Sequence, residues 1–183
     1  MSAALARPAE RRITLVQGEC RVSSDPDLVL STLLGSCVAV CLRDPVARVG
    51  GMNHFLLPGT DLSRDSSSLR YGAHAMALLV EALVAHGARR ERLGAKLFGG
   101  GRVLAGLTDL GSRNADFAET YLCGLNITYL GGSLRGDRGR RVEFWPSCGR
   151  TRQLWVRPDA GVFAAERYHA QPVDFQHAGD RDA

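Results

Sequence analysis

The sequence predicts an α+β protein built from many short strands and two helices. Short apolar runs rich in β-branched residues recur along the chain and are bounded by Gly, Pro, Asn or Asp, which is typical of strands. Two longer stretches repeat apolar residues at the spacing of an amphipathic helix. A chain of 183 residues, 45% of them hydrophobic, suits one domain with a normal core.

The N-terminal region is expected to contain a tail followed by two strands. Residues 1–12 are polar and predict a flexible tail, so the domain itself should span 13–157. Weak alternation predicts a strand over 13–16, and the apolar run at 28–30 predicts another. The pattern is lost from residue 158 onward, so 158–183 is expected to be a loose C-terminal tail.

The next stretch predicts a β-hairpin. Residues 38–42 are apolar and β-branched, Asp44-Pro45 is a turn signal, and 52–57 reads as the second strand. With the turn centred near 45–48, Cys37 and His54 are expected to lie opposite each other near the open end. Their Cβ atoms would then be roughly 5 Å apart.

The middle of the chain predicts a loop and then a long helix. Serine and aspartate are frequent at 62–69, which indicates a loop. Gly87 is a plausible end of the helix that follows. The helix itself is predicted by an apolar stripe, which consists of Met76, Leu79, Val80, Leu83 and Val84.

A glycine-rich turn, a second helix and the last strands follow. Gly99-Gly100-Gly101 comes directly after the predicted strand 95–98 and lacks the ending of a phosphate-binding P-loop, so we expect a tight turn that brings backbone near the active site. Asn114 is expected to cap a helix that runs to about Cys123. Further strands are predicted at 127–130, 142–145 and 154–156, of which the last two should form a hairpin.

Cys37 and His54 are the candidate functional residues. A cysteine at the start of one strand and a histidine on the next are the parts of a thiol nucleophile and its base. A zinc site shared with Cys41 is disfavoured, because four residues along a strand span roughly 13 Å. The spacing alone is equally typical of a small buried thiol and a hydrogen-bonded core histidine, so both interpretations stay open at this point.

The same stretch resembles a known family. Residues 35–58 read GSCVAVCLRDPVARVGGMNHFLLP and closely resemble the chemoreceptor glutamine deamidase (CheD) family, whose signature is Gly-Ser-Cys, a short strand, an Asp-Pro turn and a histidine in an apolar strand. Weaker blocks continue the resemblance over 13–156, namely KLFGGG, GSRN, YLGG and RRVEF. The first block is long and specific, whereas the later ones would be weak alone.

The resemblance implies a fold, a reaction and a set of site residues. The implied fold is a β-sandwich core of mixed sheets flanked by two main helices, and the implied reaction converts selected glutamines of methyl-accepting chemotaxis receptors into glutamates. The family's catalytic cysteine and histidine map onto Cys37 and His54. A threonine six places before the cysteine maps onto Ser31, which departs from the pattern, although Thr32 is adjacent.

The implied chemistry needs no metal and no organic cofactor. His54 would form an ion pair with the Cys37 thiolate, which attacks the glutamine side-chain carbon. Backbone N–H groups at 35–37 are candidate donors to the oxyanion, and His54 would protonate the departing ammonia before water hydrolyses the thioester. Ser31, with Thr32 as the alternative, would orient the imidazole.

The resemblance also implies partners, and two other functions stay open. The partners are the cytoplasmic helices of chemotaxis receptors and a CheC-type phosphatase. The chain could act mainly as a binding regulator of receptor signalling or of that phosphatase. It could also be a cysteine hydrolase acting on another amide.

The distribution of apolar residues and cysteines predicts the compartment in which the protein acts. No stretch approaches about 18 consecutive apolar residues, and the N-terminus has no apolar signal core, so we expect no membrane insertion and no secretion. Five cysteines at irregular spacing predict no disulfide framework and fit a reducing cytoplasm.

The net charge of +4 is carried almost wholly by arginine, and Lys96 is the only lysine. An arginine cluster is expected to form a solvated loop and the exposed face of a hairpin rather than a nucleic-acid-binding surface, for which no motif is present. Docking of acidic receptor helices is an intermediate possibility. The cluster consists of Arg135, Arg138, Arg140, Arg141, Arg150 and Arg152.

Overall fold

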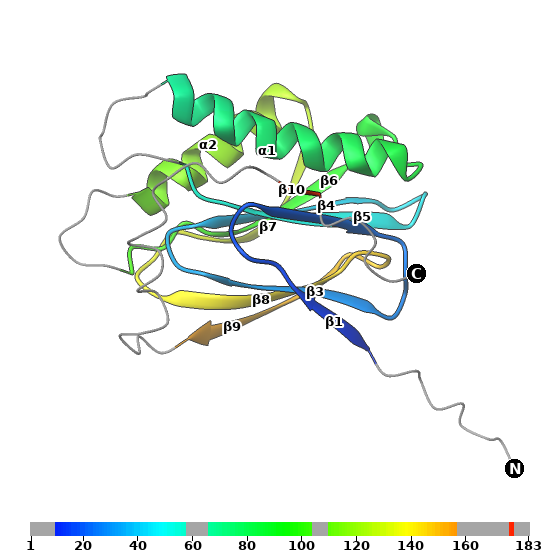
Figure 1. Ribbon diagram of the computed structural model, residues 1–183, viewed down its shortest axis with the longest axis horizontal. Helices are drawn as coiled ribbons and strands as arrows, with labels where there is room; N and C mark the ends of the chain where they lie inside the picture. The colour runs from blue at the N-terminus through cyan, green and yellow to red at the C-terminus, as the bar shows by residue number, and fades with distance from the viewer. Residues whose placement is uncertain (1–9, 58–65, 104–109, 157–175, 178–183) are drawn as a thin grey trace, which may run out of the picture.

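The computed structural model describes residues 10–57, 66–103, 110–156 and 176–177, and these build two stacked sheets with two helices on one side (Figure 1). The helices are α1 (Ser66–Ala85), α2 (Leu110–Gly124) and the short 3₁₀ helix η1 (Arg90–Arg92). The strands are β1 (Arg11–Thr14), β2 (Glu19–Ser23), β3 (Leu28–Leu34), β4 (Val38–Asp44), β5 (Val49–Phe55), β6 (Gly94–Gly99), β7 (Thr128–Leu134), β8 (Gly139–Trp145), β9 (Arg150–Val156) and β10 (Gln176–His177).

Both sheets mix parallel and antiparallel pairs. The four-stranded sheet has the order β1-β3-β8-β9, and the six-stranded sheet has the order β10-β2-β5-β4-β6-β7. The pairs β1/β3, β6/β7 and β10/β2 are parallel, and the others are antiparallel. The predicted α+β fold, a sandwich of mixed sheets flanked by two helices, is therefore confirmed.

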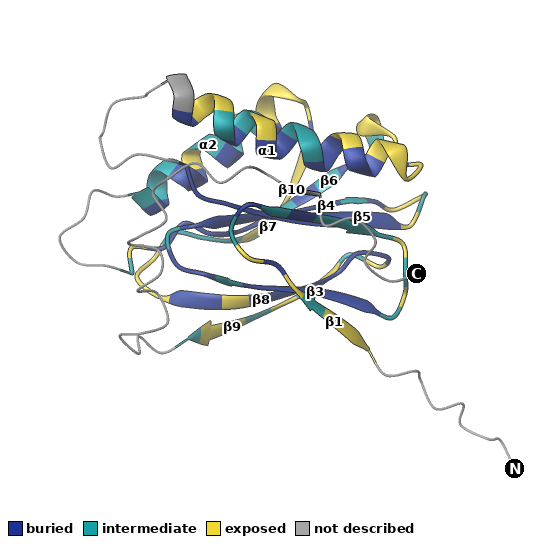
Figure 2. Cartoon of the chain, viewed as in Figure 1, coloured by how far each residue is buried: buried dark blue, intermediate teal, exposed yellow. Residues whose placement is uncertain are grey.

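Strand β4 is buried on both faces, which explains its unbroken apolar sequence. Val38, Val40 and Leu42 belong to the core between the six-stranded sheet and the helices. Cys37, Ala39 and Cys41 belong to a second core between the two sheets. Figure 2 shows the same division, with buried residues on the helix sides that face the sheet and along the strands between the layers.

The local sequence signals gave the wrong start for two helices and did not indicate strand β2. Helix α1 begins at Ser66, so part of the predicted 62–69 loop is helical; serine is common at helix starts as well as in loops. Helix α2 begins at Leu110, and Asn114 lies inside it rather than at its cap. Strand β2, at Glu19–Ser23, was not predicted, because its alternation is short and only Cys20 is fully buried.

The hairpins and the glycine turn follow the sequence closely. Asp44 pairs with Val49 across the predicted 45–48 turn, and Trp145 pairs with Arg150 across the last hairpin. The predicted tails at 1–12 and 158–183 lie mostly outside the described residues, although Gln176–His177 adds a short strand beside β2. The domain boundaries stay a prediction. Within the described residues, neither helix is long and apolar enough to cross a membrane.

Candidate active site

The β4–β5 hairpin places Cys37 and His54 on the same face, two residues out of register with the prediction. His54 pairs with Ala39 rather than with Cys37, which directly precedes β4. Because side chains alternate along a strand, Cys37 and Ala39 share a face, and His54 is the diagonal neighbour of Cys37. Diagonal neighbours lie roughly 7–8 Å apart at the backbone, within reach of long side chains. Both residues are almost fully buried between the sheets.

The hairpin is held by its turn residue, Asp44. The Asp44 carboxylate accepts hydrogen bonds from the backbone N–H groups of Val46 and Ala47, at 2.9 and 3.1 Å. It also accepts from Arg92, whose guanidinium lies 2.6 Å away. Burial would raise the pKa of Asp44, but the hydrogen bonds from Arg89, Arg92 and the turn outweigh it and lower that pKa to about 2. The turn is therefore anchored by a charged, fully buried carboxylate.

Thr32, not Ser31, contacts His54. Thr32 Oγ1 lies 2.8 Å from His54 Nδ1, whereas the Ser31 hydroxyl is buried with no hydrogen-bond partner among the described residues. Neighbours on β3 point to opposite faces of the sheet, so only one of the two can face β5. The residue within hydrogen-bond distance of His54 is therefore Thr32, the alternative third residue, and not Ser31.

The hydrogen bonds also fix which nitrogen of His54 carries the hydrogen. Thr32 has one hydroxyl hydrogen, and it donates this hydrogen to the Leu15 carbonyl at 2.8 Å. Thr32 Oγ1 must then accept from Nδ1–H of His54, so we assign the Nδ1–H tautomer. His54 Nε2 is left unprotonated, and it has no partner within the described part of the chain. This nitrogen is a base ready to accept a proton.

His54 is neutral at neutral pH. Burial lowers its pKa from 6.5 to about 4, although the nearby Leu15 carbonyl opposes the shift. The resting site therefore holds a neutral imidazole rather than the imidazolium of the expected ion pair. A neutral imidazole with a free lone pair can accept the thiol proton during the reaction, whereas an ion pair would require that this proton had already been transferred in the resting site.

The segment that carries Cys37 is clamped by three hydrogen bonds. Gly100 N–H donates to the Cys37 carbonyl at 2.7 Å, and Gly101 N–H donates to the Gly35 carbonyl at 2.8 Å. Asn114 of α2 donates to the Ser36 carbonyl at 2.9 Å. The glycine turn thus lies beside the candidate nucleophile, as its sequence predicted. A Cβ on Gly99, whose φ is +107°, would lie only 2.1 Å from the Cys37 carbonyl oxygen, so glycine is required there.

Asn114 and Gln17 are site residues that sequence reasoning missed. Besides Ser36, Asn114 binds the Leu57 N–H at 2.8 Å and so joins the start of β4 to the end of β5. Gln17, in the turn between β1 and β2, accepts a hydrogen bond from the Cys37 thiol at 3.8 Å. Gln17 lies outside the quoted blocks and Asn114 lies in the GSRN block, but only the tertiary fold brings either residue to the thiol segment.

The other cysteines do not compete with Cys37 as nucleophiles in the core. All five cysteines lie in the described residues and are free thiols. Burial raises the pKa of Cys20 to about 12, and burial raises the pKa of Cys41 further, although Lys96 opposes that shift. A thiol that stays protonated at neutral pH is a poor nucleophile.

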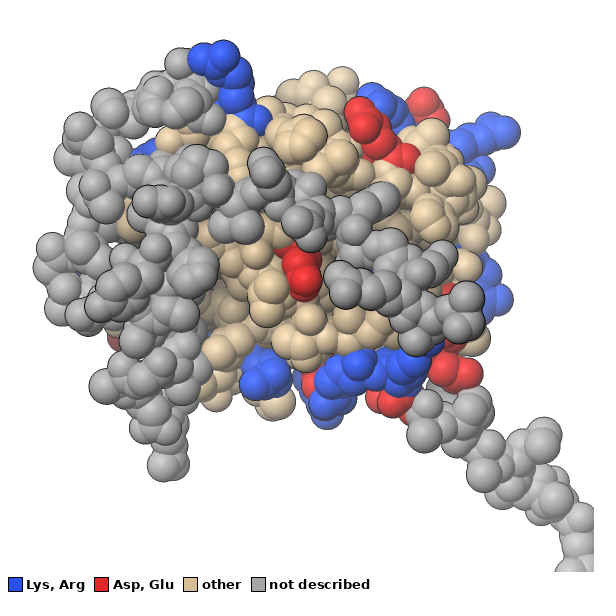
Figure 3. All heavy atoms as spheres, in the orientation of Figure 1, with Lys and Arg blue, Asp and Glu red and all other residues tan. Residues whose placement is uncertain are grey.

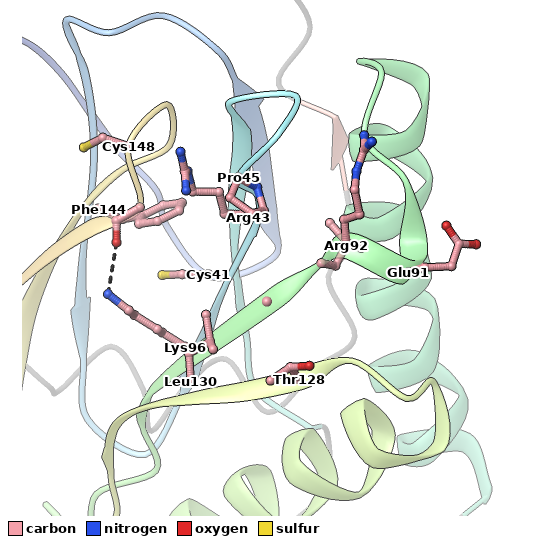
Figure 4. Close-up of a pocket in the computed structure, with 13 residues that line it drawn as sticks. Cys41, Arg43, Pro45, Glu91, Arg92, Lys96, Thr128, Leu130, Phe144 and Cys148 are labelled. Atoms are coloured by element: carbon pink, nitrogen blue, oxygen red, sulfur yellow. Dashed lines mark hydrogen bonds between the residues drawn. The ribbon is translucent and has the colours of Figure 1, made fainter.

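The cavity drawn in Figure 4 is separate from this site. It has a volume of about 350 Å³ and lies at the end of β4 opposite Cys37, beside Cys41 and Phe144. Lys96 points into it and donates to the Gly149 carbonyl at 3.0 Å, as the dashed line shows. This cavity is lined by Cys41 and not by the candidate nucleophile Cys37.

The arginine cluster is largely used within the protein. Arg135 binds Asp116 and Glu119 on α2, and Arg152 binds the buried Glu143. Arg140 is fully buried and donates to backbone carbonyls of the β7–β8 region. Figure 3 shows blue and red atoms side by side along the lower edge of the viewed face rather than one blue patch. Because these arginines are paired within the protein, they favour a structural role of the cluster over nucleic-acid binding.

A thiol, an imidazole with a free nitrogen and a hydroxyl that orients it form the kind of site that thiol-dependent hydrolases use. The family model described as CheD chemotactic sensory transduction matches residues 56–157. The chain belongs to the CheD family.

Relatives named probable chemoreceptor glutamine deamidase CheD match most of the chain. The protein from Acidiphilium cryptum is 59% identical over 152 residues, covering 81% of this chain and 80% of the relative. The protein from Rhizobium meliloti is 54% identical over 147 residues, with coverages of 79% and 80%. The protein from Caulobacter vibrioides is 47% identical over 172 residues, with coverages of 93% and 92%.

Among solved structures, the hypothetical protein YfiH of Bacillus licheniformis is similar over part of its length. It has a TM-score of 0.42 and 13% identity, and the match covers 68% of this chain and 59% of that one. The likeness is partial.

Proposed function

We propose that this protein hydrolyses side-chain amides of specific glutamines on methyl-accepting chemotaxis receptors, giving glutamate and ammonia. Its membership of the CheD family and its relatives, named as probable chemoreceptor glutamine deamidases, support the reaction and the substrate. The observation that carries the mechanism is that His54 Nε2 has no hydrogen-bond partner among the described residues and that His54 lies on the same face as the Cys37 thiol.

The proposed reaction starts with proton transfer from Cys37 to His54 Nε2. The thiolate attacks the side-chain carbon of the glutamine, and the carbonyl oxygen takes the electron pair. We infer that backbone N–H groups at 35–37 bind this oxyanion, since the carbonyls of that segment are held by Gly100, Gly101 and Asn114. Rigid peptide planes keep such donors in place without reorganisation.

The second half of the reaction uses the same imidazole. His54 gives its proton to the departing amide nitrogen, which leaves as ammonia and yields a thioester on Cys37. His54 Nε2 then takes a proton from water, whose oxygen attacks the thioester and releases glutamate and the thiol. Thr32 acts as the positioning residue, because it keeps the hydrogen on Nδ1 throughout.

Mass spectrometry of receptor fragments tests this proposal. Each conversion of glutamine to glutamate adds about 1 Da, because acyl transfer to water replaces NH₂ with OH. Wild type should convert receptor glutamines, whereas Cys37→Ala should convert none. Cys123→Ala and Cys148→Ala are matched controls, since both thiols are exposed and lie outside the site. Conversion by purified, folded Cys37→Ala protein would overturn the proposed mechanism.

We further propose a cytoplasmic location, where the receptor helices lie, and a CheC-type phosphatase as a partner. The resemblance to the CheD family supports both. Docking to receptor or phosphatase should survive Cys37→Ala, because that variant removes only the nucleophilic sulfur. Co-sedimentation with receptor-containing membranes and titration with the phosphatase measure this. Loss of both interactions in a folded Cys37→Ala protein would contradict it.

A further inference from the structure

The turn between β1 and β2 brings a second glutamine-type group to the thiol. Gln17 lies in this turn, half-buried, and its Oε1 accepts from Cys37 Sγ at 3.8 Å. The carboxamide of Gln17 is the same functional group as the one that the proposed reaction attacks. Gln17 thus offers a carboxamide in direct contact with the candidate nucleophile.

The fold holds this turn against the site residues themselves. Gly18 N–H donates to the His54 carbonyl at 2.8 Å, and Leu15 N–H donates to the Ser31 carbonyl at 2.8 Å. The Leu15 carbonyl in turn accepts from Thr32 Oγ1. Gly18 has φ +87°, a conformation that favours glycine and turns the chain directly after Gln17. The backbone on both sides of Gln17 is therefore fixed by the strands that carry His54 and Thr32.

We propose that Gln17 recognises the carboxamide of the substrate glutamine and helps to hold its oxygen during attack. Two carboxamides are complementary, because each offers an N–H donor and a carbonyl acceptor. Oε1 of Gln17 can accept from the substrate NH₂ while the NH₂ of Gln17 donates to the substrate oxygen. This inference rests on the proposed role of Cys37 as the nucleophile.

The same contact separates substrate from product. A glutamate carboxylate has no N–H group, so it cannot donate to Oε1 of Gln17 and would leave an acceptor facing an acceptor. The site would therefore favour the amide over the acid and release the product after hydrolysis. Transfer of the Cys37 proton to His54 also frees Oε1 from the thiol, at the moment when the substrate amide needs an acceptor.

Two nearly isosteric substitutions test the role of Gln17. Gln17→Met removes the amide, and Gln17→Glu keeps one acceptor but adds a charge. Val16→Ala is the matched control, because Val16 is in the same turn but is 59% exposed. Gln17→Met should lower kcat/KM for receptor fragments by about 10²-fold, the effect of removing one preorganised donor, with no change in the thermal midpoint. Val16→Ala should keep wild-type activity.

Two further measurements detect effects that a merely structural role would not produce. Inhibition by the glutamate form of the receptor fragment should strengthen relative to substrate binding in Gln17→Met, since discrimination against the carboxylate is lost. The pH profile of Cys37 alkylation should move to higher pH in Gln17→Glu but not in Gln17→Met, because only the former sets a negative charge beside the thiol.

The failure of this inference is distinguishable from failure of the proposed function. An inactive Cys37→Ala protein together with unchanged kcat/KM and product inhibition in Gln17→Met would overturn the role of Gln17 alone. An active Cys37→Ala protein would instead overturn the proposed mechanism. A mass increase of about 1 Da on the Gln17 peptide of wild type, absent in Cys37→Ala, would make Gln17 a substrate of its own site and also overturn the recognition role.

Discussion

The buried, neutral His54 makes the stability of this protein depend on pH in a defined way. Burial lowers the pKa of His54 from 6.5 to about 4, so between these values the unfolded chain binds a proton that the folded protein does not. Proton uptake by the unfolded state destabilises the fold as the pH falls. The contribution of His54 is thus fully present above pH 6.5 and is lost progressively as the pH falls toward 4.

The magnitude follows from the two pKa values. Each pKa unit corresponds to about 1.4 kcal/mol, so the full difference is about 3 kcal/mol, of which about 2 kcal/mol is lost between about pH 7 and about pH 5. Urea denaturation of wild type and His54→Asn at both pH values measures it. The variant should be less stable at neutral pH, but its free energy of unfolding should fall by about 2 kcal/mol less on acidification.

Two exposed histidines provide the matched control. His74 and His86 lie on the surface of the described chain, so His74→Asn should leave the pH dependence of stability unchanged. If wild type and His54→Asn lose stability in parallel between the two pH values, His54 is not held neutral by burial. The assignment of Nε2 as a resting base would then be wrong.

Three further predictions concern residues that position the site. Thr32→Val should lower kcat by up to about 10²-fold because His54 loses its orienting oxygen, whereas Ser31→Ala should stay near wild type in the same assay; the reverse order would return the role to Ser31. Asp44→Asn should lower the free energy of unfolding at neutral pH by about 3 kcal/mol, since Arg92 loses its buried charged partner. The difference from wild type should shrink as the pH falls toward 2, where the carboxylate is protonated. An unchanged urea midpoint at neutral pH would contradict this. Gly99→Ala should abolish deamidation by displacing the Cys37 carbonyl. Gly87 has a similar φ but open space around its Cβ, so Gly87→Ala should lower the free energy of unfolding by only about 1 kcal/mol and keep activity. Equal effects of both variants on stability and activity would show that backbone strain alone, not contact with Cys37, decides the outcome.

The hairpin and its two candidate site residues could be predicted because their signals are local. The β-branched run, the Asp44-Pro45 turn and the period of two place Cys37 and His54 on neighbouring strands within 18 residues of sequence. Even there the predicted register was wrong by two residues, since Asp44 and Val49 define the last pair of β4 and β5, and this sets Ala39 opposite His54. A turn in the sequence shows which two strands pair more reliably than it shows which residues of those strands lie opposite each other.

The third residue and the supporting contacts could not be predicted, because they depend on the packing of one sheet against the other. The face that β3 turns toward His54 is set by its pairing with β8, more than a hundred residues later in the chain. No local pattern distinguishes Thr32 from Ser31. Similarly, asparagine is a residue type that favours helix caps, which led to the prediction for Asn114. Its hydrogen bonds to Ser36 and Leu57 instead keep Asn114 inside α2 and beside the segment that carries the thiol. Tertiary hydrogen bonds override local preference at these positions.

The central claim, that Cys37 carries the acyl group of the substrate, is tested most directly by trapping the thioester. Hydroxylamine added to wild type with a receptor fragment should divert the glutamyl group to a hydroxamate, because a strong nucleophile competes with water for the thioester. The account predicts hydroxamate at the same glutamines that are otherwise converted to glutamate, and none with Cys37→Ala. Hydroxamate or glutamate formed at wild-type rate by Cys37→Ala would contradict it.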